Sequence, residues 1–137
     1  MKKTIRLVLL PALVASPLLL AAHPMGNFSI NHHSKIHVSS GAISITTILD
    51  FAEISTFQLF SDPRRASEHA GEWVSGLRLQ TAGRRLPLHM RNVQSEIVPA
   101  PTGLPTLRVQ LELAANWTPD DTVLSFKDEN YSRRIGW

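Results

Sequence analysis

Apolar and polar residues alternate along much of the chain, which is the pattern of half-buried β-strands. The clearest case runs from Leu107 to Leu113, where every second residue is apolar and the residues between are Arg108, Gln110 and Glu112. We expect the apolar set to face a core and the polar set to face solvent. Residues 28–38 and 43–51 alternate in the same way, and segments at 77–81, 86–98 and 123–126 are also strand-like. The pattern predicts six or seven short strands.

One segment follows a helical period instead. Asp62 and Pro63 suit the N-cap and the first position of a helix, and Gly76 suits its end. Between them, apolar residues recur on one helical face, at Ala66, Ala70, Trp73, Val74 and Leu77. Short strands with turn signals and one helix predict a mainly β protein, a two-sheet antiparallel sandwich with one short α-helix.

The first 22 residues, Met1 to Ala22, have the pattern of a secretory signal peptide. A basic start is followed by an apolar run over residues 7–20, and that run is interrupted by Pro11 and Pro17. We expect cleavage after Ala22 and a periplasmic or otherwise extracytoplasmic domain over residues 23–137. Retention of the leader as an uncleaved anchor is the alternative. Ile135-Gly136-Trp137 looks like the opening of another strand, so we expect that the chain is a fragment of a longer protein.

Cleavage changes the charge of the chain. Three of its 14 basic residues (Lys2, Lys3 and Arg6) lie in the leader, so 14 − 3 = 11 basic residues remain against 11 acidic ones. A balanced charge argues against nucleic acid as a partner. The chain also has no cysteine, which excludes thiolate metal sites, cysteine nucleophiles and disulfides. An exported domain of this kind must be held by its core.

The segment that follows the leader contains four of the six histidines: His23, His32, His33 and His37. A mature chain that begins at His23 offers an α-amine and an imidazole on one residue, which together can chelate a metal ion. Imidazole ligands suit transition metals, so we expect Ni²⁺, Co²⁺ or Cu²⁺. Polar histidines on an exposed strand are the competing interpretation.

Alternation decides how these histidines are arranged. Adjacent strand residues project to opposite faces, so His32 shares a face with Phe28 and Ile30, whereas His33 shares a face with His37. His33 and His37 would lie roughly 13 Å apart, too far to bind one ion. We expect His23 and one of His32 and His33 to form the site, and favour His32 because a partly buried imidazole is better fixed.

Two acidic pairs, Asp50 with Glu53 and Asp128 with Glu129, are further candidates for the site. Their carboxylates could supply oxygen ligands or orient a metal-bound imidazole. Each pair taken alone also fits capping and turn chemistry. The chain has no Gly-rich phosphate loop, no Gly-x-Ser-x-Gly elbow and no His-Glu-x-x-His helix. We therefore expect no enzymatic activity.

Three segments together resemble the exported N-terminal domain of bacterial nickel/cobalt transporter-like membrane proteins. They are His23-Pro-Met-Gly-Asn-Phe-Ser-Ile-Asn-His32; Leu49-Asp-Phe-Ala-Glu-Ile54 with Thr56-Phe-Gln58; and Phe126-Lys-Asp-Glu-Asn-Tyr131 with Arg134-Ile-Gly-Trp137. The resemblance implies that a multi-helix membrane part follows this domain. It also implies the candidate site residues His23, His32, Asp50, Glu53, Asp128 and Glu129. The chain departs from the family pattern at His33, where Tyr is typical, and at Ser55, where Pro is typical.

Three functions follow from these observations. The first is a soluble extracytoplasmic domain of such a transporter, in cis or as its partner, which binds a divalent transition metal through histidines. The second is a structural or interaction module that docks a membrane partner without metal. The third, and the weakest, is a copper enzyme that uses His23 as its N-terminal ligand.

Overall fold

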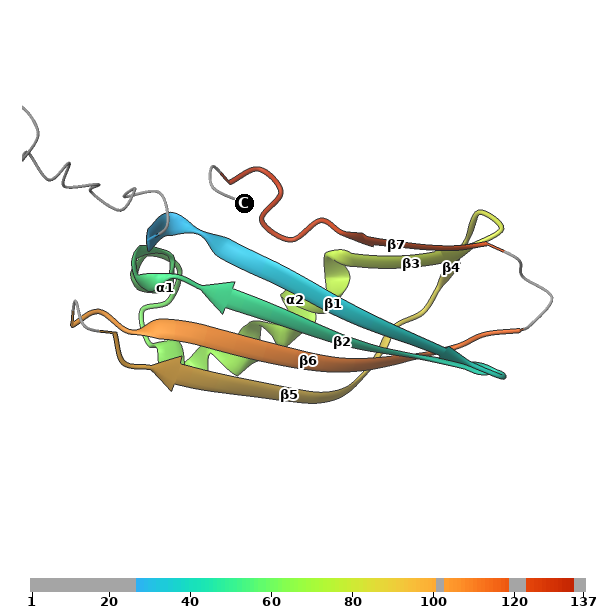
Figure 1. Cartoon of the computed structure of the whole chain (residues 1–137), viewed down its shortest axis with the longest axis horizontal. Coiled ribbons are helices and arrows are strands. Elements are labelled where there is room, and N and C mark those ends of the chain that lie inside the picture. The colour runs from blue at the N-terminus through green and yellow to red at the C-terminus, as the bar shows by residue number, and fades with distance from the viewer. Residues whose placement is uncertain (1–26, 101–102, 119–122, 135–137) are drawn as a thin grey trace, which may run out of the picture.

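The computed structural model describes residues 27–100, 103–118 and 123–134. Two strands come first, two short helical regions follow, and the remaining strands complete the domain (Figure 1). In chain order, the elements are β1 (Ile30–Ser39), β2 (Ala42–Phe51), α1 (Glu53–Leu59), the 3₁₀ helix η3 (Pro63–His69), α2 (Ala70–Ser75), β3 (Leu77–Thr81), β4 (Arg84–Leu86), β5 (His89–Val98), β6 (Thr106–Asn116) and β7 (Leu124–Asp128).

The strands form two antiparallel sheets. The larger sheet has four strands in the order β1-β2-β6-β5, and the smaller has three in the order β4-β3-β7. β2 pairs over its full length with β1 and with residues 107–116 of β6, without a shift in register. β5 pairs with β6 around one β-bulge between Met90 and Asn92. The predicted mainly β, two-sheet antiparallel fold is confirmed.

The core lies between the two sheets, and strand alternation determines which residues fill it. Leu107, Val109, Leu111 and Leu113 of β6 are buried, as predicted, and they oppose buried side chains of β2. Trp73 and Phe60 add large rings beside Phe51 at the helical end of this core. The alternation of β6 therefore places one continuous apolar row at the centre of the domain.

The predicted helix between Asp62 and Gly76 is present, but its first half is a 3₁₀ helix and its second half is α2. The Asp62 side chain accepts a hydrogen bond from the Arg64 backbone N–H at 3.1 Å, which is the predicted N-cap contact. η3 packs against β5 and β6. This helical segment thus covers the end of the larger sheet and leads directly into β3.

α1 is an element that the hydrophobic pattern does not predict. It is seven residues long and lies within the apolar run from Leu49 to Phe60. The Thr56 hydroxyl donates to the Phe51 carbonyl at 3.1 Å, and the Ser55 hydroxyl donates to the Phe28 carbonyl at 2.5 Å. These two buried hydroxyls attach the helix to the end of β2 and to the residues just before β1.

A two-residue turn joins β3 to β4. Ala82 and Gly83 both have positive φ, 44° and 77°, as a type I′ hairpin turn requires.

None of the helices among the described residues is long and apolar enough to cross a bilayer. The predicted leader and the strand-like residues 135–137 lie outside the described ranges.

Candidate functional site around His32 and Asp128

β1 is an edge strand of the larger sheet, and its pleat determines where its histidines point. Ile30 is buried and His32 is half-buried on the same face, opposite the buried Leu49 of β2. His33 and His37 are exposed on the other face. The alternation predicted for β1 therefore continues without a break, and it separates His32 from the other two histidines.

Asp128 is the last residue of β7, which is an edge strand of the smaller sheet. Its Oδ2 lies 2.7 Å from Nδ1 of His32, and each of the two side chains is only 12% exposed. The residues are 96 positions apart in the sequence. The pair therefore connects the edges of the two sheets through one short, largely enclosed polar contact.

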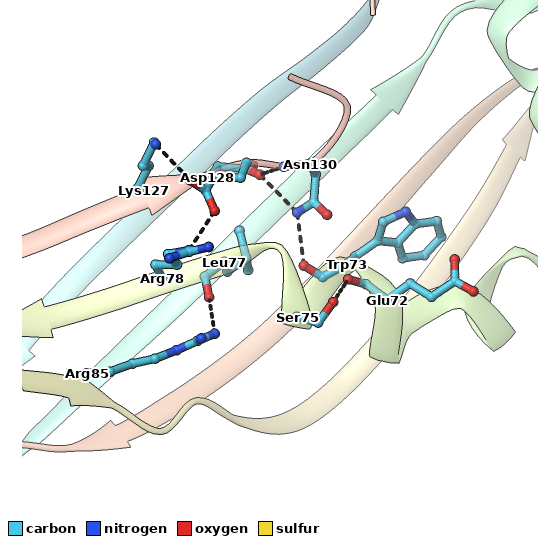
Figure 2. Close-up of polar contacts among 10 residues, drawn as sticks. Glu72, Trp73, Ser75, Leu77, Arg78, Arg85, Lys127, Asp128 and Asn130 are labelled. Carbon is cyan, nitrogen blue, oxygen red and sulfur yellow. Dashed lines mark hydrogen bonds and ion pairs between the residues drawn. The ribbon is translucent and has the colours of Figure 1, made fainter. Parts of the chain in front are cut away.

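The second carboxylate oxygen of Asp128 is also engaged. Oδ1 accepts hydrogen bonds from the backbone N–H and the side-chain Nδ2 of Asn130, both at 2.9 Å. The same Nδ2 donates to the Trp73 carbonyl at 2.9 Å, as Figure 2 shows. The carboxylate of Asp128 is thus held between β1 and the turn after β7, and Asn130 fixes that turn to α2.

Tyr131 completes this cluster on its apolar side. Its ring makes edge-to-face contacts with His32 and Phe51, at centroid separations of 6.2 and 5.6 Å. Its hydroxyl accepts a hydrogen bond from Nε1 of Trp73 at 2.8 Å, and burial raises the pKa of the phenol. Tyr131 has a left-handed backbone (φ 56°), which a non-glycine residue adopts when its surroundings hold it there.

The segments that carry the family resemblance meet in this region. His32 of the first segment contacts Asp128 and Tyr131 of the last, and Phe51 of the middle segment contacts Tyr131. Gln58 accepts a hydrogen bond from Arg134 at 2.5 Å, which joins the middle and last segments a second time. Residues that are far apart in sequence are therefore neighbours in the fold.

Ser55, one of the two departures from the family pattern, also has a defined contact. It is fully buried, and its hydroxyl bonds to the Phe28 carbonyl just before β1. A proline at this position would not have that donor. The departure therefore affects how α1 is attached to the first segment.

Asp50 does not belong to this cluster. It points to the outer face of the larger sheet, where its two oxygens bond to Arg108 at 2.7 and 3.0 Å. The pair lines a depression of about 420 Å³ at the ends of β1, β2 and β6. His32 faces the interior of the sandwich, so the sheet itself separates Asp50 from His32.

The remaining acidic candidates also have other surroundings. Glu53 is the half-buried first residue of α1, where a negative charge favours the helix N-terminus. Glu129 pairs with Lys127 at 2.7 Å and with Arg78 at 2.5 Å. The hydrogen bond from Lys127 and the charge of Arg78 lower the pKa of the Glu129 carboxyl. Glu53 therefore lies at a helix start, whereas Glu129 forms ion pairs with two basic side chains.

His23 lies outside the described residues. Within residues 27–100, 103–118 and 123–134, no three histidine or acidic side chains come together as a metal-binding group. Of the predicted site residues that the structure describes, it brings His32 and Asp128 together.

The structure adds Trp73, Asn130 and Tyr131 to this pair. Trp73 lies on the predicted apolar face of the helix, whereas Asn130 and Tyr131 are not among the predicted site residues. Asn130 and Tyr131 lie in the last of the resembling segments, and this position is the sequence signal that could have identified them.

Comparisons of the chain with models of protein families, with curated proteins and with solved structures find no match.

Proposed function

We propose that this chain is the extracytoplasmic soluble domain of a nickel/cobalt transporter-like membrane protein, and that it binds a divalent transition metal beside His32. The observation that carries the proposal is the contact between His32 and Asp128. It unites the first and last of the segments that resemble this class of domain. Both residues were candidates from the sequence, although nothing in strand alternation relates them to each other.

The chemistry of the pair suits a metal-bound imidazole. An ionised carboxylate can only accept, so the hydrogen bond to Asp128 requires the proton of His32 on Nδ1. In the neutral ring, Nε2 then carries the lone pair that binds a metal. A carboxylate that fixes the tautomer and orientation of an imidazole is the common support for a histidine ligand.

The donors that complete the site come from His23 in this proposal. An α-amine and an imidazole on one residue, together with His32, give three nitrogen ligands, a set suited to Ni²⁺, Co²⁺ or Cu²⁺. His32 is nine positions after His23. A segment of that length is long enough for residue 23 to reach His32 on β1.

Calorimetric titration of the exported, processed chain with each metal tests the site. We expect binding at about pH 7.5 and much weaker binding at about pH 5.5, because protons compete with the metal for imidazole nitrogen. Blocking the α-amine should weaken binding without touching the fold. The combined variant His23→Ala with His32→Ala should abolish it.

His33→Ala is the matched control, since it removes an imidazole one residue away on the opposite face of β1. It should leave the affinity unchanged. Circular dichroism would confirm that the His32 variant remains folded. Equal affinity in the wild type and in the combined variant would refute the proposed metal site.

A second function, docking to a membrane partner without metal, is favoured by the exposed side chain of Phe57. This residue lies on α1 and is 71% exposed. Phe28 and Leu104 are also exposed large apolar residues. If no metal binds, this function remains. Apolar spans of about 20 residues in the reading frame downstream of Trp137 would support the transporter context shared by both functions.

A further inference from the structure

β5 is an open edge of the larger sheet, and it differs from the other three strand edges. It pairs with β6 on one side, and no described strand pairs with its other side (Figure 1). β4 and β7 are short edges of three and five residues. β1 is as long as β5. On its inner face, His32 is covered by its contact with Asp128, and Val38 is the one exposed large apolar side chain of that strand. A ten-residue edge with free backbone groups is a template for another strand.

The inner face of β5 is incompletely covered. Met90 and Ile97 point toward the core, because they oppose the buried Leu113 and Leu107 of β6. They are nevertheless 46% and 37% exposed. A further strand beside β5 would cover both side chains and continue the apolar layer of the sheet.

The outer face of β5 carries charges of opposite sign. Glu96 lies opposite Arg108 of β6, which in turn bonds to Asp50 of β2. Across the sheet this row therefore runs negative, positive, negative and ends at Glu96. A positive group on the next strand would continue the alternation, and opposite charges across strands stabilise their pairing.

We propose that β5 binds antiparallel to β5 of a second copy of this chain, with Gln94 opposite Gln94. A two-fold axis at Gln94 places Val93 opposite Ser95 and Asn92 opposite Glu96. The bulge then brings Met90 opposite Ile97, so that the two exposed apolar side chains meet. Arg91 is the extra residue of the bulge, and it lies beside Glu96 of the second copy. In this register, apolar side chains meet on the inner face of the strand, and side chains of opposite charge lie beside each other across the interface.

The bulge makes this pairing possible. Met90 and Ile97 are seven positions apart, so an unbroken strand would point them to opposite faces. The extra residue at Arg91 shifts the pleat, and both then face inward. The resulting interface is isologous, as a two-fold dimer requires. It is independent of metal binding, because none of these residues belongs to the proposed metal site.

Charge reversal tests the pairing in the exported chain. Sedimentation should show a dimer, and Glu96→Arg or Arg91→Glu alone should raise its dissociation constant by at least about tenfold, through like-charge repulsion. The combined variant should restore dimerisation. The combined variant still has an arginine at position 96, next to Arg108 of the same copy. Recovery of the dimer would therefore show that repulsion within one copy does not cause the dissociation. Thermal melts of all three variants would confirm that they are folded.

Single cysteines test the register, because the chain has none of its own. Gln94→Cys should give a covalent dimer with a short bis-maleimide. The matched control His33→Cys, on the outer face of the other long edge, should not. A monomer at all concentrations up to about 1 mM, a dimer unaffected by either single reversal, or crosslinking at residue 33 instead of 94 would each overturn the proposal.

Discussion

Two aspartates of the resembling segments, Asp128 and Asp50, end in very different surroundings. Both lie on strands, and both bind a basic side chain at 2.7 Å. The pair of Asp128 with His32 is 12% exposed on each side, and it joins strands of different sheets. The pair of Asp50 with Arg108 is 38% and 55% exposed, and it joins neighbouring strands of one sheet.

The difference shows that contact distance alone says little about how much a pair contributes to the stability of the fold. Solvent screens the charges of Asp50 and Arg108, and exposed pairs of this kind contribute little to stability. Asp128 has lost most of its hydration, so it depends on the three hydrogen bonds that it accepts. Removing one of these partners leaves the rest of the cluster with unsatisfied polar groups.

The largest effect is expected from Asp128→Ala. The substitution leaves His32 and Asn130 without their acceptor, so the free energy of unfolding should fall by about 3 kcal/mol. Denaturant unfolding followed by circular dichroism would measure it. Asp128→Asn retains an oxygen acceptor and should lose less. A loss below about 0.5 kcal/mol in Asp128→Ala lies within the range of ordinary surface changes. It would mean that the enclosed pair of Asp128 contributes no more to stability than the exposed pair of Asp50.

Tyr131 allows the enclosed region to be probed by pH. Burial raises the pKa of its phenol, so the folded state favours the neutral form. This contribution to stability is present below the ordinary phenol pKa of about 10, and it is lost as pH rises through the raised value.

The chain has a single tyrosine, so absorbance of the tyrosinate reports on Tyr131 alone. The midpoint should lie above about 10 in the folded protein and should return to that value in denaturant. The alkaline loss of stability should be smaller in Tyr131→Phe than in the wild type. A folded midpoint at or below the denatured one would contradict the enclosed setting of this side chain.

The smallest effect is expected for the exposed pair. A double-mutant cycle of Asp50→Ala and Arg108→Ala should give a coupling free energy near the limit of detection in denaturant unfolding. It should shrink further with added salt, because screening acts on exposed charges. A coupling as large as the full effect of Asp128→Ala would mean that exposure does not explain the comparison.

Strand alternation predicted most of the fold, because each sheet has one buried and one exposed face. It predicted the inward row of β6 and the opposite directions of His32 and His33. It did not predict α1, since the apolar run from Leu49 to Phe60 contains no change of period that would mark a helix. It also did not predict the 3₁₀ form of η3, because the capping signal of Asp62 and Pro63 is the same for both helix types.

The site was less predictable than the fold. Local periodicity gives the face on which His32 lies but not what packs against that face. Its contact with Asp128 depends on how two sheets meet across 96 residues. The same holds for Asn130, whose partner on Trp73 lies 57 residues away. Only the family resemblance grouped His32 with Asp128 before the fold was known.

The turn after β7 leaves no room for a side chain at position 76. A Cβ atom on Gly76 would lie 2.2 Å from Oδ1 of Asn130, although the backbone of Gly76, at φ −76°, is open to any residue. A larger residue at 76 is therefore compatible with this turn only together with a smaller one at 130. That second change would give up the bonds of Asn130 to Trp73 and Asp128. Positions 76 and 130 thus form an epistatic pair, in which each residue limits what evolution or a designer can place at the other.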